Sequence, residues 1–163
     1  MILQYFKNKE NKEQIIATEQ YKNILSESTK FLKDNDFFTS KDFKTSFEIV
    51  SIFMIMFIRK NLLDDNRKKY LKVNDKLISL FISDLDESLR DKGIGDMSIG
   101  KYVKSYVKKF YFRISKFPVD NNLYKNEYFI EYLRITNLIK NDDYIKVSRK
   151  FNDKFGDFLN STN

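Results

Sequence analysis

The chain has 163 residues, 42% of them apolar, with only four glycines and one proline. Antiparallel sheets need many turns built from such residues, so this composition disfavours a β protein and favours long helices. The absence of cysteine and histidine excludes disulfides, thiolate chemistry and a serine–histidine–aspartate triad. The net charge of +7 is compatible with an anionic partner such as a membrane surface or RNA, and equally with a soluble, lysine-rich surface.

The N-terminal segment, MILQYFKNKENKEQ, offers no targeting signal. It has no apolar stretch long enough for a secretory signal peptide. It also lacks arginine and carries two glutamates, unlike a mitochondrial transit peptide. We therefore expect the protein to act in the compartment where it is made.

Apolar spacing predicts an all-α fold, a single-domain bundle of about six helices. The predicted helices cover residues 12–32, 40–63, 67–91, 97–117, 122–140 and 142–159. Ser40 is the expected N-cap of the second helix, and the fourth is expected to end before Pro118.

The second predicted helix contains the most apolar stretch, IVSIFMIMFI at residues 49–58. Ten helical residues rise about 15 Å, half of a ~30 Å bilayer core, so this stretch is too short to span a membrane comfortably. A helix that is apolar on every side is usually the central one of a bundle. The other interpretation is a groove for an apolar client, to which Met54 and Met56 would adapt their shape.

The fourth predicted helix is basic and amphipathic. Its apolar stripe recurs every three or four residues and consists of Val103, Tyr106, Val107, Phe110, Tyr111 and Ile114. The remaining circumference carries Lys101, Lys104, Lys108, Lys109, Arg113 and Lys116, with no acidic residue among them. Such a helix either packs on a core with a solvated basic face, or binds an anionic membrane or RNA.

Three of the four glycines lie in LRDKGIGDMSIGK, residues 89–101. Its second half fits part of a phosphate-binding loop, but such a loop follows a strand and has serine or threonine after the lysine. Here the preceding residues have helical spacing and Tyr102 follows the lysine, so we interpret the segment as a turn between two helices. We expect Gly93 to adopt a positive φ at the helix end, and Asp96 or Ser98 to cap the next helix.

The turn and its flanks, SDLDESLRDKGIGDMSIGKYVKSYVKKFYFR, resemble the signature of the ubiquinol–cytochrome c chaperone family. The matching positions are Asp86, Leu89, Arg90, Gly93, Ile94, Gly95, Asp96, Ile99, Lys101, Val103, Lys104, Phe110, Tyr111 and Arg113. Phe112 stands where the signature has glycine. The resemblance extends over most of the chain from about Phe38. It predicts an N-terminal helical segment at residues 1–37 and a chaperone-like helical domain at residues 38–163, together one folding unit.

The resemblance implies an assembly chaperone, not an enzyme, that binds newly made cytochrome b, the membrane subunit of ubiquinol–cytochrome c reductase (complex III). It also implies association with the ribosome and with a small co-chaperone protein, and neither a cofactor nor a DNA partner. Peripheral contact with an anionic membrane is expected from the basic fourth helix. The candidate partner-binding residues are Asp86, Leu89, Arg90, Gly93, Gly95, Asp96, Lys101, Lys104, Phe110, Tyr111 and Arg113.

The length and the missing transit peptide look like those of a bacterial member. We therefore expect a cytoplasmic protein at the periphery of the inner membrane, or on the matrix side if the source is eukaryotic. The alternative function is a basic amphipathic protein of membrane surfaces, or of RNA and the ribosome, without a respiratory role. An enzyme is a further alternative, but no paired carboxylates stand in a recognisable context.

Arg90 and Asp96 have two interpretations on the sequence alone. They either tie the two helices together through a charge-assisted hydrogen bond or contact a partner directly.

Overall fold

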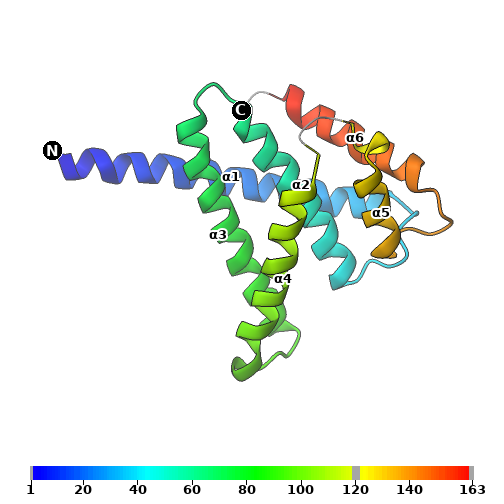
Figure 1. The fold of residues 1–163 in the computed structure, drawn as a ribbon. Coiled ribbons are helices and arrows are strands. Elements are labelled where there is room, and N and C mark those ends of the chain that lie inside the picture. Colours follow the sequence, from blue (N-terminus) through cyan, green and yellow to red (C-terminus); the bar gives the residue numbers. More distant parts are fainter. Residues whose placement is uncertain (1, 119–121, 162–163) are drawn as a thin grey trace. The chain divides into compact units, whose positions relative to one another are not determined.

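A computed structural model describes residues 2–118 and 122–161, with side chains from Lys12 onwards. Within these residues the fold is all-α, without a strand, and its only β feature is an isolated bridge between Phe38 and Ile139. The elements, shown in Figure 1, are α1 (Ile2–Asp34), α2 (Phe43–Leu62), α3 (Arg67–Asp91), α4 (Asp96–Lys116), the 3₁₀ turn η1 (Leu123–Lys125), α5 (Glu127–Ile135) and α6 (Tyr144–Asn160). The predicted bundle of about six helices is confirmed.

The helices form two compact units, each made of two stretches of chain. Unit 1 contains Met1–Asn23 and Asn61–Ile114, which include the first part of α1, all of α3 and most of α4. Unit 2 contains Ile24–Lys60 and Ser115–Asn163, which include most of α2 together with η1, α5 and α6. The expected division between residues 1–37 and 38–163 remains a prediction.

The first two helices start at other residues than predicted. α1 begins at Ile2 rather than near residue 12, because a nucleated helix extends through polar residues without needing an apolar stripe. α2 begins at Phe43, and Asp42 rather than Ser40 is its N-cap. The Oδ1 atom of Asp42 accepts a hydrogen bond from the N–H of Thr45 at 2.9 Å. The hydroxyl of Ser40 instead pairs with that of Thr45 at 2.8 Å.

The predicted helix over residues 122–140 is wrong. η1 occupies its start, and Asn126 then caps α5 by accepting from the N–H of Phe129 at 2.9 Å. α5 ends at Ile135, and Asn137 adopts a left-handed conformation with φ of 51°. Asparagine tolerates this region better than most residues, so the helix stops here although the apolar pattern continues.

α2 is the central helix of unit 2, as predicted. Every residue from Ser51 to Ile58 is buried, and Met54 and Met56 have no exposed surface. The alternative interpretation of these methionines as the lining of a client groove is therefore wrong. Aromatic rings from three helices pack in this core, with centroid distances of 4.8 Å for Phe31–Phe151, 5.5 Å for Phe31–Phe53 and 4.7 Å for Phe57–Phe158.

Unit 1 is organised by the buried stripe of α3. Its apolar members are Tyr70, Val73, Leu77, Phe81, Leu85 and Leu89. The Phe81 ring meets Phe110 of α4 at a centroid distance of 4.8 Å. Figure 1 shows α3 and α4 running antiparallel as a hairpin. The sequence signature therefore lies on one hairpin within one unit.

Buried polar side chains also link the elements of unit 1. The Asn61 amide donates to Gln20 at 2.8 Å and to Asn74 at 2.7 Å, and accepts from Gln20 at 2.9 Å. The hydroxyl of Tyr21 in α1 donates to Asp84 of α3 at 2.5 Å. No helix within residues 2–118 or 122–161 is long and apolar enough to cross a membrane.

Candidate functional site

The turn between α3 and α4 is built around Gly93, whose φ is 86°. Its N–H donates to the Arg90 carbonyl at 2.8 Å, and the N–H of Ile94 donates to the Leu89 carbonyl at 3.3 Å. These two bonds form a Schellman motif, which satisfies carbonyl groups at a helix end. Glycine adopts the required positive φ without steric cost, so the expected role of Gly93 is confirmed.

α4 begins directly after this turn. The carbonyl of Gly95 accepts the first hydrogen bonds of the helix, from the N–H groups of Ser98 at 2.9 Å and Ile99 at 3.0 Å. Gly95 is therefore at the N-cap position, and the expectation that Asp96 or Ser98 would be there is wrong. Asp96 is the first residue of α4, where the positive end of the helix dipole favours its negative charge.

Arg90 lies between two carboxylates. Its Nε donates to Oδ1 of Asp86 at 2.6 Å, one turn earlier in α3, and its Nη1 donates to Oδ1 of Asp96 at the start of α4. Both bonds raise the pKa of Arg90, the bond to Asp86 being the larger cause. One guanidinium thus joins the two helices across the turn. Of the two interpretations of Arg90 and Asp96, the structure contains the hydrogen bond that links the two helices. Direct contact of these residues with a partner remains a prediction.

α4 has one face towards α3 and one towards solvent. Ile99 and Phe110 are buried on the first face, and the flanking members of the predicted apolar stripe are half-buried. Lys101 and Lys104 are exposed on the other face. Tyr111, which we expected within the buried stripe, is 49% exposed, because it lies about 100° around the helix from Phe110.

The candidate residues fall into three groups along the hairpin. At the turn the structure brings together Asp86, Leu89, Arg90, Gly93, Gly95 and Asp96. Lys101 and Lys104 follow within the next turns of α4. Phe110, Tyr111 and half-buried Arg113 lie near its other end, with Arg113 roughly 25 Å along the helix from Asp96. The signature therefore extends over the length of the hairpin and does not converge on one pocket-like centre.

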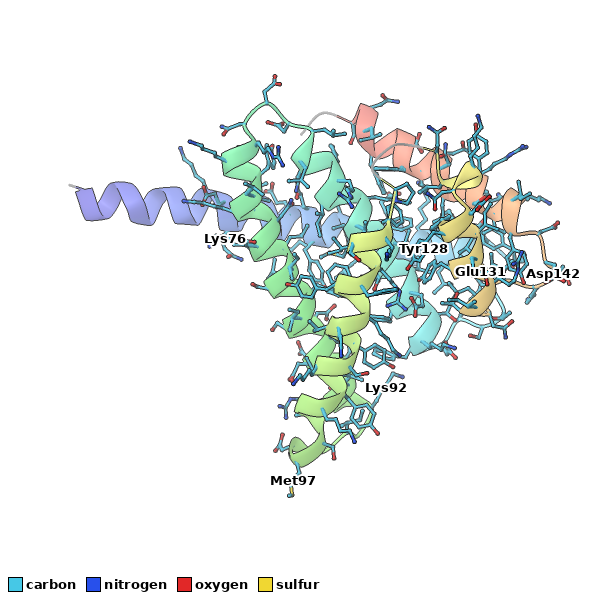
Figure 2. The ribbon with its side chains drawn as sticks, in the orientation of Figure 1. Lys76, Lys92, Met97, Tyr128, Glu131 and Asp142 are labelled. Carbon is cyan, nitrogen blue, oxygen red and sulfur yellow. The ribbon has the colours of Figure 1, made fainter. Side chains whose placement is uncertain are left out.

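Three exposed apolar residues of α4 were not among the predicted site residues. They are Met97, Tyr102 and Phe112, with exposed fractions of 103%, 48% and 57%. Figure 2 shows Met97 projecting outward at the turn end of the hairpin. Their position on the helical circumference, away from the stripe of Ile99 and Phe110, is the sequence signal that could have identified them.

The hairpin does not have the architecture of a nucleotide site. GDMSIGK forms the end of the turn and the beginning of α4, and a helix rather than a strand precedes it. This geometry excludes a phosphate-binding loop at this place. Among the described side chains, no three or more of His, Cys, Asp or Glu are grouped so that they could hold a metal ion.

The hairpin and the fold are shared with known proteins. A family model described as ubiquinol–cytochrome C chaperone matches residues 35–118, just over half of the chain, and includes all of α2, α3 and α4. The crystal structure of the Cbp3 homolog from Brucella abortus matches with a TM-score of 0.74, covering 100% of this chain and 91% of that chain. Sequence identity to it is 18%, so that likeness shows the fold alone. No curated protein matches in a sequence search.

Proposed function

Because the chain belongs to the ubiquinol–cytochrome c chaperone family, we propose that it is a non-catalytic assembly chaperone that binds newly made cytochrome b and supports assembly of ubiquinol–cytochrome c reductase. The observation that carries this proposal is the family match over residues 35–118, which includes the whole hairpin signature. The family's chaperone role also supports a function without catalysis.

The client contact is proposed to lie on unit 1. An apolar membrane protein needs exposed apolar side chains on its chaperone, and α2 cannot offer them because none of its apolar residues is exposed. Of the large apolar side chains that are exposed in the described part of the chain, most belong to unit 1. These are Ile15, Leu63, Leu71, Met97, Tyr102, Tyr111 and Phe112, against Ile135 and Ile145 in unit 2.

The proposal includes three further partners. The family suggests a small co-chaperone protein and the ribosome, and the positive charge of the chain suggests an anionic membrane. A small co-chaperone protein and the ribosome would hold the chaperone where cytochrome b is made. The net charge of +7 and the acid-free basic stretch of α4 support peripheral contact with the anionic inner membrane, on its cytoplasmic or matrix side.

The proposal is tested by identifying what the protein binds in its own cell. The tagged chain is purified from gently solubilised membranes after brief crosslinking, and the bound proteins are identified. Enrichment of cytochrome b ahead of the other complex III subunits would support the proposal. A variant with Lys101→Glu and Lys104→Glu, checked for unchanged folding, would show whether the basic face contributes to this binding or is only solvated.

The alternative function is a basic protein of membrane surfaces or RNA without a respiratory role. The stretch from Lys101 to Lys116, which carries six basic residues and no acidic one, favours this alternative. Recovery of ribosomal proteins or RNA alone, with cytochrome b absent, would support it and contradict the chaperone proposal.

A further inference from the structure

The solvent side of α4 carries lysines and apolar side chains in one continuous stripe. We call this stripe the outer face of α4, and it consists of Met97, Lys101, Lys104, Lys108, Tyr111 and Phe112. All six side chains are exposed. Since successive residues turn by about 100° and rise about 1.5 Å, they occupy about 100° of the circumference and about 22 Å of its length.

The outer face lies opposite the packed face of the same helix. Ile99 and Phe110 are buried towards α3 and hold α4 in the hairpin, whereas the residues of the outer face are exposed. The electrostatic character of the outer face is uniform, because the sequence has no acidic residue from Met97 to Lys116. The outer face thus combines positive charge with exposed apolar and aromatic surface, without a carboxylate to repel anions.

We propose that the outer face of α4 binds the interfacial region of an anionic lipid bilayer, with the helix axis parallel to the membrane. Lysine suits this position because its aliphatic stem lies along apolar surface while its ammonium group reaches the lipid phosphates. Tyrosine has an apolar ring and a polar hydroxyl and is enriched at this depth of a membrane. Met97 and Phe112, near the two ends of the outer face, would enter the boundary between headgroups and acyl chains.

The composition of the outer face favours lipid over RNA. Proteins that bind single-stranded RNA combine a basic groove with aromatic rings on which bases stack. The outer face is a convex helix surface, and its most exposed apolar residue is Met97, which is aliphatic and offers no ring. Arginine, the preferred side chain for bidentate contact with phosphate, does not occur in it.

This inference rests on the proposed function for its biological setting and adds the surface that would keep the chaperone beside a membrane-inserted client. The other exposed apolar residues of unit 1 lie outside the outer face and stay available for that client, namely Ile15, Leu63, Leu71 and Tyr102. Lipid binding can be measured with the purified chain alone. Its failure would therefore not affect cytochrome b binding, which is measured separately in cells.

A tryptophan reporter tests insertion, because the natural chain contains no tryptophan. Phe112→Trp places the reporter on the outer face, and Ile145→Trp places a matched control on α6, where the natural side chain is 55% exposed against 57% for Phe112. With vesicles containing about one third phosphatidylglycerol at low salt, we expect a blue shift and quenching by brominated lipid for Phe112→Trp alone. No shift at Phe112→Trp, or an equal shift for both variants, would overturn the proposal.

A second pair of matched variants tests whether the lysines of the outer face contribute to vesicle binding. The triple change Lys101→Gln, Lys104→Gln and Lys108→Gln is expected to weaken vesicle binding on the order of 100-fold at low salt. The control triple, Lys30→Gln, Lys33→Gln and Lys146→Gln, removes three charges from exposed positions elsewhere and should change binding only a few-fold. Equal losses would overturn the proposal, since they would show that net charge alone decides binding.

RNA provides the last comparison. A single-stranded RNA oligonucleotide that binds through the same three lysines, while anionic vesicles do not bind, would assign the outer face to RNA and contradict the lipid proposal. Binding to vesicles that RNA fails to displace at equal ionic strength would support it.

Discussion

Arg90, near the end of α3, donates a hydrogen bond to Asp96, the first residue of α4, and so spans the turn between the two helices. The same guanidinium also holds Asp86 one turn back in α3. The Arg90 guanidinium and the Schellman hydrogen bonds around Gly93 together hold the turn that joins α3 to α4. The turn residues of the signature therefore have a structural role, and the partner contacts of our proposals lie along α4 and elsewhere on unit 1.

Substituting Gly93 is expected to destabilise the fold. Gly93→Ala places a Cβ on a residue with φ of 86°, which costs about 1–2 kcal/mol of the free energy of unfolding. Beyond the adjoining residues no atom lies within 4 Å of the added Cβ, so the cost comes from the backbone conformation and not from a clash. The check is the urea midpoint of each variant. Gly100→Ala is the control, because its Cβ also meets open space within a helix and should stabilise by about 0.5–1 kcal/mol.

Breaking the tie at Arg90 is expected to have a small, salt-dependent effect. Arg90→Gln keeps much of the length of the side chain but removes its charge and both ion pairs, with Asp86 and with Asp96. Both ion pairs are exposed, so each contributes little to stability. Thermal melts should show a slightly lower Tm at low salt and a smaller difference in 1 M NaCl. A large loss that salt does not reduce would contradict the assignment of these contacts as surface ion pairs.

The cap at Asp42 predicts a pH dependence in the acid range. The hydrogen bond from the Thr45 N–H holds the pKa of Asp42 below its ordinary 3.8. Its stabilisation is therefore fully present above that value and is lost as the pH falls through the lower folded pKa. Asp42→Ala should cost about 1 kcal/mol at neutral pH, whereas Asp42→Asn keeps a cap.

The comparison that isolates the charge is wild type against Asp42→Asn. Urea melts at about pH 5 and about pH 2 should show wild type losing more stability on acidification than Asp42→Asn. Equal losses of stability in wild type and in Asp42→Asn would mean that the fold does not favour the charged form of the Asp42 carboxylate.

The raised pKa of Tyr21 leads us to expect a loss of stability at alkaline pH. Burial raises its pKa above the ordinary 10.0, and the hydrogen bond to Asp84 adds to the shift. The neutral hydroxyl is thus favoured in the folded state, and its contribution is lost as the pH rises above 10. Tyr21→Phe should lower the free energy of unfolding by about 1 kcal/mol at pH 7. Its deficit relative to wild type should shrink at alkaline pH, and a constant deficit would contradict this account.

The sequence was most informative where pattern and local chemistry agreed. α3 has the predicted bounds of residues 67–91, because its apolar spacing, its charged start and the glycine after its end all indicate one helix. The position and conformation of Gly93 followed for the same reason. Family signature and helical periodicity also placed the candidate residues on one hairpin.

Other features depended on information that periodicity does not contain. The interruption of the predicted fifth helix rests on the backbone conformations at Asn126 and Asn137, which apolar spacing cannot register. The N-cap at Asp42 was missed because Ser40 and Asp42, two residues apart, are both of a type that commonly caps a helix. The two units are built from stretches distant in sequence, and such pairing depends on tertiary contacts. The lysines of the outer face were predicted on the basic side of α4, but Met97 and Phe112 were not assigned to it, although their spacing places them there.

The central claim is that this protein holds cytochrome b before complex III is assembled, and a pulse-chase experiment tests it most directly. Newly made proteins are labelled briefly in cells, and the tagged chain and the complete complex are isolated at successive times. The account predicts that labelled cytochrome b is recovered first with the tagged chain and moves to the complete complex during the chase. If labelled cytochrome b never accompanies the chain and reaches the complex at an unchanged rate when the chain is absent, the account is contradicted.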